Sequence, residues 1–250
     1  MDDVILDQFR RLLSGLSIDD PWPTLIESGF LDLMRAEAAG GAGFDLERAF
    51  PIFLEAGRHP ELRGFVETCL ARIVAPDAVL VMDAEKALLA GGVSPETARA
   101  LAAAGAAALM AGAMLRVLEL TVDYASTRKQ FGRPIGGFQA VQHQISAMAE
   151  EVMAARIAVQ AAFVGAPLEM KSLSAGSAKV RAGQAAITVG SVAHAVHGAI
   201  GVSHEHVLHL YTDALARWRL AHGGEAFWAR AIGAWAIAQD GDFVTLARGL

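Results

Sequence analysis

The sequence predicts an all-α protein, in which a small helical subdomain precedes an antiparallel four-helix bundle. Three observations lead to this prediction. Apolar residues recur every three or four positions along most of the 250-residue chain. Glycine and proline interrupt that pattern at intervals typical of helix ends. No convincing set of segments alternates apolar and polar residues as half-buried β-strands do.

Residues 1–75 are expected to form the N-terminal α-helical subdomain. Apolar residues at helical spacing indicate a first helix over 2–16, which the prolines at 21 and 23 follow. A second helix is expected to begin at Trp22-Pro23-Thr24 and to carry apolar residues as far as Leu33. After a glycine-rich turn, a third helix over 44–57 and a fourth over 62–74 complete the subdomain.

Residues 76–94 differ and are interpreted as a connector. Asp77–Asp83 has two interpretations that the sequence leaves open, a short strand or the start of a helix that continues through Leu89. Gly91-Gly92 ends the segment.

Residues 95–250 are expected to form the bundle. Ser94 is a suitable N-cap and Pro95 is tolerated in a first turn, so the first long helix begins there and runs through Thr127. Three more long helices and a shorter one are predicted over 138–163, 172–197, 205–221 and 224–238. Short turns join them, which makes neighbouring helices antiparallel.

Composition excludes several classes of protein. With 54% hydrophobic and 19% charged residues the chain is too apolar for disorder and indicates much buried surface, including subunit interfaces. A net charge of −6 gives no bulk attraction to nucleic acid or anionic membranes. Cys69 is the single cysteine, so no intrachain disulfide forms and a cytoplasmic location is expected.

No membrane span and no signal peptide are expected from the sequence. The N-terminus is acidic and amphipathic, without the basic start and apolar core of a signal peptide. The uncharged alanine-rich run between Arg99 and Arg116 is rich in Ala and Gly and is shorter than the roughly 20 residues that a span needs.

The turn Arg128–Gln139 has an unusual composition. It gathers cations, amides, two aromatic rings, three glycines and a proline between two apolar helices. Such residues fill a core poorly, but arginine pairs in bidentate fashion with phosphate oxygens and a phenyl ring offers a flat face. The turn is therefore a candidate site for an anion beside a flat ring. The structural alternative is an ordinary helix–helix turn, in which the arginine is solvated and the phenylalanine fills the core.

The order of residues in RKQFGRPIGGFQAVQ resembles the signature of the FAD-dependent acyl-CoA dehydrogenase family, in its C-terminal helical bundle. Three other features lie in register with that family: Gly112 in the preceding helix, Lys179 on the third bundle helix and the turn His197–Gly201. Residues 37–43 and 53–58 resemble its N-terminal helical domain. The resemblance covers most of residues 20–240 outside the connector.

The resemblance implies FAD chemistry on an acyl-CoA thioester, in which a carboxylate removes the α-proton and the β-hydride passes to the flavin. It assigns Arg128, Gln130 and Phe131 to the pyrophosphate and adenine end of the flavin, usually that of a neighbouring subunit. The other cofactor-binding residues that it implies are Gly132, His197, Gly198 and Gly201.

The chain also departs from the family pattern. Full-length relatives carry a β-sheet domain between their helical halves, and here only the connector stands in that place, so the middle β domain is missing. Ala195 takes the place of a glutamine that the family uses at the adenine end of the flavin. Ala199 replaces the second glycine of the turn, and Thr212 replaces an arginine.

The catalytic glutamate of the family is absent as well. Ala221 or His222 takes the place where one branch carries it, and residues 98–108 offer no acid where a second branch does. Glu225 lies one turn further on and is a candidate displaced base, with an exposed or helix-start carboxylate as the alternative. His222 is the other candidate, because a histidine side chain can take up and release a proton near neutral pH.

The stretch 208–228 resembles the partner-type subunits of heteromeric acyl-CoA dehydrogenases in bacterial sterol and side-chain catabolism. Such subunits keep the Arg-x-Gln-Phe-Gly turn while the partner supplies the base. The first hypothesis is therefore a small acyl-CoA dehydrogenase subunit that completes the FAD site of a larger homologue, as a homo- or hetero-oligomer.

Two alternatives remain open at this point. One is a non-catalytic structural or regulatory relative that oligomerises through the bundle and binds no flavin. The other is a thioester-binding enzyme that has dropped the redox step.

A metal site is not expected, although five of the eight histidines fall within 16 residues. These are His194, His197, His204, His206 and His209. A partly buried turn with polar rings is the favoured interpretation, and the Glu-x-x-His pairs of di-iron bundles are absent.

Overall fold

A computed structural model describes residues 2–17 and 20–239, and within them the all-α prediction is confirmed. The N-terminal helices are α1 (Asp2–Ser14), α2 (Trp22–Glu27), α3 (Leu46–Gly57), α4 (Phe65–Ala71) and α5 (Ala84–Ala90), with the 3₁₀ turns η1 (Phe30–Asp32) and η2 (Glu37–Ala39). The bundle helices are α6 (Pro95–Thr127), α7 (Gln139–Ala162), α8 (Ser172–His197), α9 (Leu208–Leu220) and α10 (Glu225–Ile237). Further 3₁₀ turns are η3 (Ile135–Gly137), η4 (Pro167–Glu169) and η5 (Gly198–Val202).

The predicted second and fourth helices are shorter than expected. Helix α2 stops at Glu27, because Ser28 donates to the carbonyl of Leu25 and Gly29 takes a left-handed conformation at φ 78°. Only the 3₁₀ turn η1 follows it. Helix α4 begins at Phe65 rather than Leu62, since Gly64 before it is also left-handed, at φ 85°.

The connector contains a helix and, over 77–83, no strand. Helix α5 starts only at Ala84, where the Asp83 side chain caps it by accepting from the Lys86 amide at 3.0 Å. The preceding segment has no regular structure and is held by the hydroxyl of Thr68, which accepts from the Val81 amide at 2.8 Å. The boundaries of the three parts at residues 75 and 94 stay a prediction.

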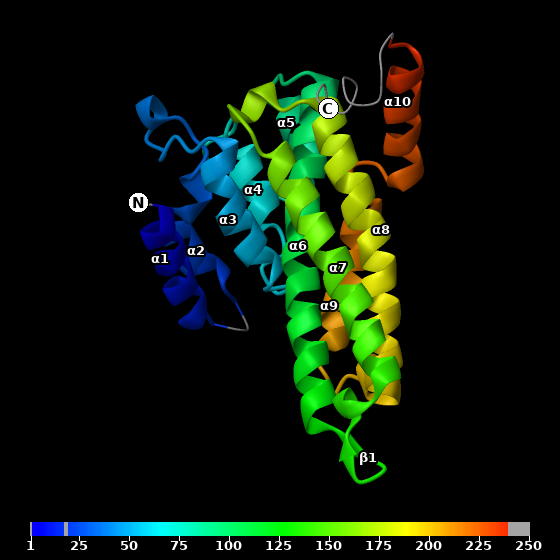
Figure 1. The fold of residues 1–250 in the computed structure, drawn as a ribbon. Helices are drawn as coiled ribbons and strands as arrows, with labels where there is room; N and C mark the ends of the chain where they lie inside the picture. Colours follow the sequence, from blue (N-terminus) through cyan, green and yellow to red (C-terminus); the bar gives the residue numbers. More distant parts are fainter. Residues whose placement is uncertain (1, 18–19, 240–250) are drawn as a thin grey trace.

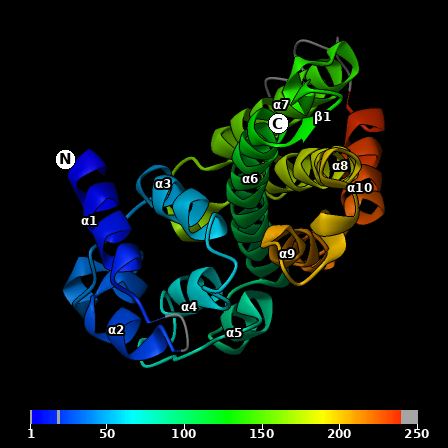
Figure 2. The same ribbon diagram turned by 90° about the horizontal axis from the view of Figure 1, so that it is seen from below.

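Helix α6 is the central element of the fold. Viewed along the bundle, α3, α4 and α5 lie on one side of it and α7 and α8 on the other (Figure 2). Nearly every residue from Ala98 to Met114 is buried, and most of them are alanine or glycine. Small side chains let several neighbours approach the helix closely, so one helix serves as a wall for both groups of helices.

Helices α3 and α6 cross with their backbones in contact. A Cβ atom on Gly112 would overlap the carbonyl oxygen of Leu54 and lie 3.0 Å from the Cα of Gly57. Conversely, a Cβ atom on Gly57 would overlap the carbonyl oxygen of Leu109. Both glycines are therefore required by the close approach of the two helices rather than by their own backbone conformation.

Two described helices are long and apolar enough to cross a membrane when judged by length and composition alone: α6 and the stretch Ser172–Val202. The length of α6, 33 residues, exceeds the uncharged run on which the sequence expectation rested. In α6, however, 83% of the apolar window is buried inside the fold, as in a core helix of a bundle. For the second stretch the buried share is 39%, which leaves one side uncovered by this chain.

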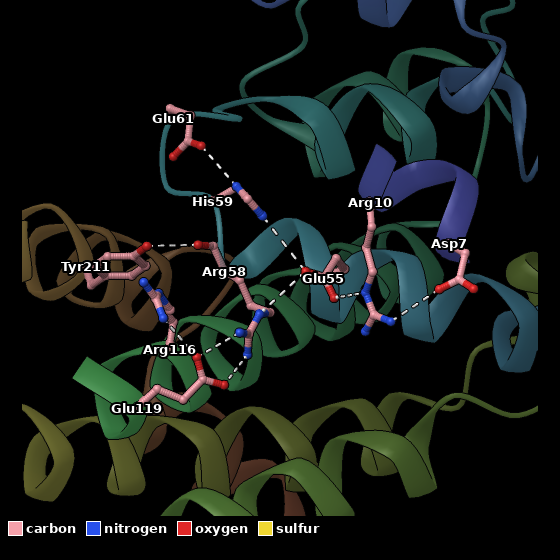
Figure 3. A network of polar contacts seen from close by, with 9 residues as sticks. All are labelled: Asp7, Arg10, Glu55, Arg58, His59, Glu61, Arg116, Glu119 and Tyr211. Carbon is pink, nitrogen blue, oxygen red and sulfur yellow. Dashed lines mark hydrogen bonds and ion pairs between the residues drawn. The ribbon is translucent and has the colours of Figure 1, made fainter. Parts of the chain in front are cut away.

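A polar network fastens the N-terminal helices to the bundle (Figure 3). Glu55 of α3 is 8% exposed, accepts from Arg10 of α1 at 2.9 Å and forms an ion pair with Arg58 at 3.4 Å. Arg58 in turn donates both terminal nitrogens to Glu119 of α6, at 2.9 and 2.8 Å. The hydroxyl of Tyr211 on α9 donates to the Arg58 carbonyl at 2.9 Å. The network thus joins α1, α3, α6 and α9.

His59 makes this network pH-dependent, and replacing it by glutamine tests the effect. The ion pair with Glu55 at 3.8 Å and the hydrogen bond to Glu61 at 3.0 Å raise the pKa of His59 to about 9. The folded state then binds the proton more tightly, so the stabilisation is complete below about pH 6.5 and is lost as pH rises through about 9. The ring is 33% exposed, and solvent screening limits the effect to about 1 kcal/mol.

Urea denaturation of wild type and His59→Gln at about pH 6 and about pH 9.5 measures how much His59 contributes to the free energy of unfolding. We expect wild type to be the more stable protein at the lower pH and the difference to vanish at the higher one. A difference of the same size at both values would contradict the assignment.

Candidate functional site

The turn between α6 and α7 folds into a small hairpin. Strands β1 (Lys129–Gln130) and β2 (Arg133–Pro134) pair antiparallel, and Phe131 and Gly132 form the loop at φ 51° and 81°. A two-residue loop with positive φ at both positions matches the twist of paired strands. The sequence predicted a turn here but no strands, because pairs of two residues carry no alternating pattern.

The tip of the hairpin is exposed. Phe131 is 90% exposed and meets Phe138 edge-on at 6.0 Å, while the Arg133 guanidinium lies 4.2 Å from the centre of the Phe138 ring. Arg128 and Gln130 are exposed too, and no side chain in the described part of the chain pairs with the guanidinium of Arg128. A cation, an amide and a bare ring are thus left available to something outside this chain.

The turn after α8 contains the second group of predicted cofactor residues. The ring of His197 is 3% exposed, stacks on Tyr124 of α6 at 4.5 Å and donates from Nδ1 to the Ala193 carbonyl at 2.8 Å. Burial lowers the pKa of His197, which favours the neutral imidazole. Gly198 has φ 64° and ψ −145°, a conformation that favours glycine. A Cβ atom on Gly201 would lie 2.9 Å from that of His197.

Both groups lie at the same end of the bundle, where α6 and α8 both finish (Figure 1). Arg128, Gln130, Phe131 and Gly132 stand on the hairpin, and His197, Gly198 and Gly201 on the adjacent turn. The two groups differ in one respect. The hairpin exposes side chains, whereas the turn exposes the backbone of Gly198 and hides the imidazole. The cofactor roles of these residues stay predictions.

Lys179 belongs to a different region and caps a helix. It is 1% exposed and donates from Nζ to the carbonyls of Arg219 at 2.7 Å and Gly223 at 3.2 Å. The Arg219 carbonyl lies in the last turn of α9, where helix carbonyls lack intrahelical partners, and Gly223 lies in the turn between α9 and α10. Burial lowers the pKa of Lys179 to about 8.

Glu225, the first catalytic candidate, is engaged elsewhere. It begins α10 and forms a short hydrogen-bonded ion pair with Arg219. Burial alone would raise the pKa of Glu225, but the contact with Arg219 outweighs burial and holds the pKa below its ordinary value. A paired carboxylate with a low pKa is a poor proton acceptor, so the geometry favours the helix-start alternative.

His222, the second candidate, lies between α9 and α10 with its backbone at φ 55°. Its Nδ1 is 3.1 Å from Oε2 of Glu85 on α5, and Glu85 also accepts from Arg99 at 2.8 Å. His222 lines a cavity of about 250 Å³ that Glu225 does not line. The two candidates therefore do not form one site.

Sequence reasoning missed Glu67 and Glu85. Glu67 lines the same cavity as His222, and burial raises the pKa of its carboxyl to about 7. The available signal was a lone acid in the apolar run FVETCLA. Nothing in the sequence near Glu85 indicated its contact with His222, which is 137 residues away along the chain.

No group of three His, Cys, Asp or Glu side chains in the described parts of the chain is arranged to hold a metal ion. The clustered histidines contact one another as rings: His197 meets His206 at 4.8 Å, and His204 meets His209 at 4.9 Å. These contacts are consistent with packing at the end of the bundle.

Comparison with known proteins gives a family match. The family model described as acyl-CoA dehydrogenase, C-terminal domain, matches residues 96–235, which is more than half of the chain. The acyl-CoA dehydrogenase IpdE2 of Mycobacterium tuberculosis is 40% identical over 117 residues, 47% of this chain and 34% of that protein. The 3-sulfinopropanoyl-CoA desulfinase of Paraburkholderia xenovorans is 39% identical over 97 residues, 39% of this chain and 25% of that protein.

The chain thus spans about a third or less of the length of these curated relatives. A solved structure of similar length is a chain of the ChsE4-ChsE5 complex from Mycobacterium tuberculosis. The match covers 96% of both chains, with a TM-score of 0.72 and 19% sequence identity. At that identity the likeness concerns the fold.

Proposed function

Because the chain belongs to the acyl-CoA dehydrogenase family, we propose that it is the small subunit of an FAD-dependent acyl-CoA dehydrogenase. Its hairpin completes a flavin site on a larger partner chain, and that partner supplies the catalytic base. The observation that carries the proposal is the exposed hairpin tip, where Phe131 is 90% exposed and no side chain in the described part of the chain pairs with those of Arg128 and Gln130.

The chemistry of the hairpin fits the adenine and pyrophosphate end of FAD. The guanidinium of Arg128 donates two hydrogen bonds to phosphate oxygens, and the face of Phe131 packs against a flat ring. Gly132 at φ 81° has no atoms within 4 Å of its missing Cβ, so a ligand can approach the backbone. When bound, FAD supplies the acceptor for the hydride that leaves the acyl-CoA.

Two observations support a hetero-oligomer. The fold at this length is also that of a chain in the ChsE4-ChsE5 complex, whose name indicates two kinds of subunit. Helices α8 and α10 also expose apolar side chains that a partner would cover, namely Ile187, Phe227 and Ile237. By the resemblance of residues 208–228, we extend the proposal to a cytoplasmic enzyme of bacterial sterol or side-chain catabolism.

The second candidate is a non-catalytic relative that assembles through the bundle and binds no flavin. The substitutions Ala195 and Thr212, together with the pairing of Glu225 to Arg219, favour it. Both candidates keep the fold, so only cofactor content and activity separate them.

Co-expression with the larger homologue encoded nearest to this chain tests the proposal. We expect a colourless chain when it is produced alone, and a yellow complex that dehydrogenates acyl-CoA when the two are produced together. The visible absorption spectrum and reduction of an artificial electron acceptor are the measurements. Colourless protein in both preparations, without dehydrogenation, would leave the non-catalytic candidate.

A further inference from the structure

A cavity lies where α1, α3, α6 and α7 meet, next to the polar network of Figure 3. It holds about 510 Å³, within the range of about 300–1,000 Å³ that is usual for small-molecule sites. It shares no lining residue with the cavity beside His222. Leu115, which lines it on α6, precedes Arg128 by 13 positions, roughly 20 Å along a helix. The cavity is therefore separate from the hairpin and from the region of His222.

The lining combines apolar and polar side chains at helical spacing. The apolar residues are Leu6 of α1, Phe50, Pro51 and Leu54 of α3, and Leu115 of α6. On α1 and α6 a charged residue follows the apolar one by four positions, namely Arg10 and Glu119. Residues four positions apart lie one above the other on the same face of a helix. A ligand that fits this cavity therefore has an apolar body and a polar end.

The polar network beside the cavity is balanced in charge. Its cations are Arg10, Arg58, Arg116 and His59, whose pKa of about 9 keeps the imidazole protonated at neutral pH. Its carboxylates are Asp7, Glu55, Glu61 and Glu119. Each of these groups is paired with at least one other of the network. The network therefore leaves no charge over for a ligand.

Arg156 of α7 lines the same cavity and adds one positive charge to it. No carboxylate in the described part of the chain lies within ion-pair distance of its guanidinium, and the residues three and four positions away on α7 are the uncharged Val152, Met153, Val159 and Gln160. Arg156 is also partly buried. Since withdrawing a charge from water without a partner is costly, an anion that pairs with this guanidinium is favoured. Gln160 lines the cavity one turn further on, and its amide can donate another hydrogen bond.

We propose that this cavity binds a small monocarboxylate with an apolar body, whose carboxylate pairs with Arg156 and Gln160 and whose body packs against Leu54 and Leu115. The assignment requires neither flavin nor a partner subunit, and it goes beyond the function proposed above.

The charge balance selects a carboxylate among the common anions. The planar fork of the Arg156 guanidinium matches the two oxygens of a carboxylate. One unpaired cation balances one negative charge. A phosphate group, with close to two negative charges, would bring a surplus charge into a cavity that Glu55 and Glu119 also line.

A bound ligand would also affect stability, because the lining comes from both parts of the fold. It would touch α1 and α3 of the N-terminal part and α6 and α7 of the bundle. These contacts would add to those that the polar network makes between the two parts. A ligand that binds only the folded chain raises the melting temperature by mass action, which gives a second readout beside affinity.

Isothermal titration calorimetry on the full chain produced alone tests the proposal. The probes are 4-phenylbutanoate and 4-phenylbutan-1-ol, which share the apolar body and differ in the polar end. We expect the acid to bind with a dissociation constant of about 1 mM or below and to raise the melting temperature. The alcohol should bind at least about 10-fold more weakly, because it lacks the charge-assisted hydrogen bonds. No binding of the acid, or equal affinity for the two probes, would overturn the proposal.

Arg156→Gln locates the carboxylate. The variant should fold normally, since no described carboxylate pairs with this guanidinium. We expect its affinity for the acid to fall by about 10-fold or more and its affinity for the alcohol to stay unchanged, a difference that general damage to the fold would not produce. Unchanged affinity for the acid would refute the assignment.

Two further variants complete the experiment. Arg230→Gln removes an exposed arginine on α10 and is the matched control, so it should bind the acid as wild type does. An equal loss in this variant would reveal a general effect of net charge and contradict a site at Arg156. Arg156→Lys keeps the charge without the fork, and its affinity should lie between those of wild type and Arg156→Gln. Because no flavin is present, the outcome is independent of the test of the proposed subunit function.

Discussion

Replacing Gly112 by alanine is expected to lower the free energy of unfolding by about 3 kcal/mol or more, at the upper end of the usual range for overpacking. The added methyl group would overlap the Leu54 carbonyl oxygen, and the nearest other atom is the Cα of Gly57. Neither obstacle is a flexible side chain, so helices α3 and α6 must move apart. Urea denaturation measures the loss.

Gly190→Ala is the matched control for this experiment. Gly190 also lies inside a long bundle helix, α8, but its missing Cβ has no atom within 4 Å. Alanine there is expected to leave stability unchanged or raise it by up to about 1 kcal/mol, because alanine is the better helix former. Equal losses at both positions would show that the α3–α6 contact carries no special constraint.

Replacing Arg128 by alanine in the assembled complex is expected to weaken flavin binding by about 10- to 100-fold. A charge-assisted hydrogen bond contributes about 1.5–3 kcal/mol, and 1.4 kcal/mol corresponds to a factor of ten. The fold should not change, because no side chain in the described part of the chain pairs with this guanidinium. Fluorescence titration of the apo-complex with FAD measures the dissociation constant.

Lys129→Ala is the control for Arg128→Ala, since it removes the same charge from the neighbouring position. Lys129 is exposed on β1, where successive side chains point to opposite faces. We expect its flavin affinity to stay within about twofold of wild type, as befits a screened surface charge. Unaltered affinity in Arg128→Ala would remove the role of the hairpin in the proposed function.

The long helices could be predicted closely from the sequence. Their apolar residues recur over many turns, and local signals such as Ser94-Pro95 mark their ends, so the limits of α6 and α8 agree with the expected ones. The short N-terminal helices were predicted less well. Their ends depend on single glycines such as Gly29 and Gly64, whose left-handed conformation tertiary packing selects.

The candidate sites also differ in how well the sequence alone predicts them. The hairpin residues Arg128–Gly132 are contiguous, so a sequence pattern can identify them together. The Glu85–His222 pair and the cap that Lys179 gives to α9 join residues far apart in the chain. Only the fold brings these groups together, and no single stretch of sequence carries a signal for them.

The position of α6 has a consequence for folding. One continuous apolar core includes Phe9 of α1 and Leu215 of α9, and α6 contributes to it along most of its length. Neither the N-terminal helices nor the remaining bundle helices bury all of their apolar faces without α6. The chain therefore gains most of its stability only when both groups have docked on the same helix, as in a single cooperative folding unit.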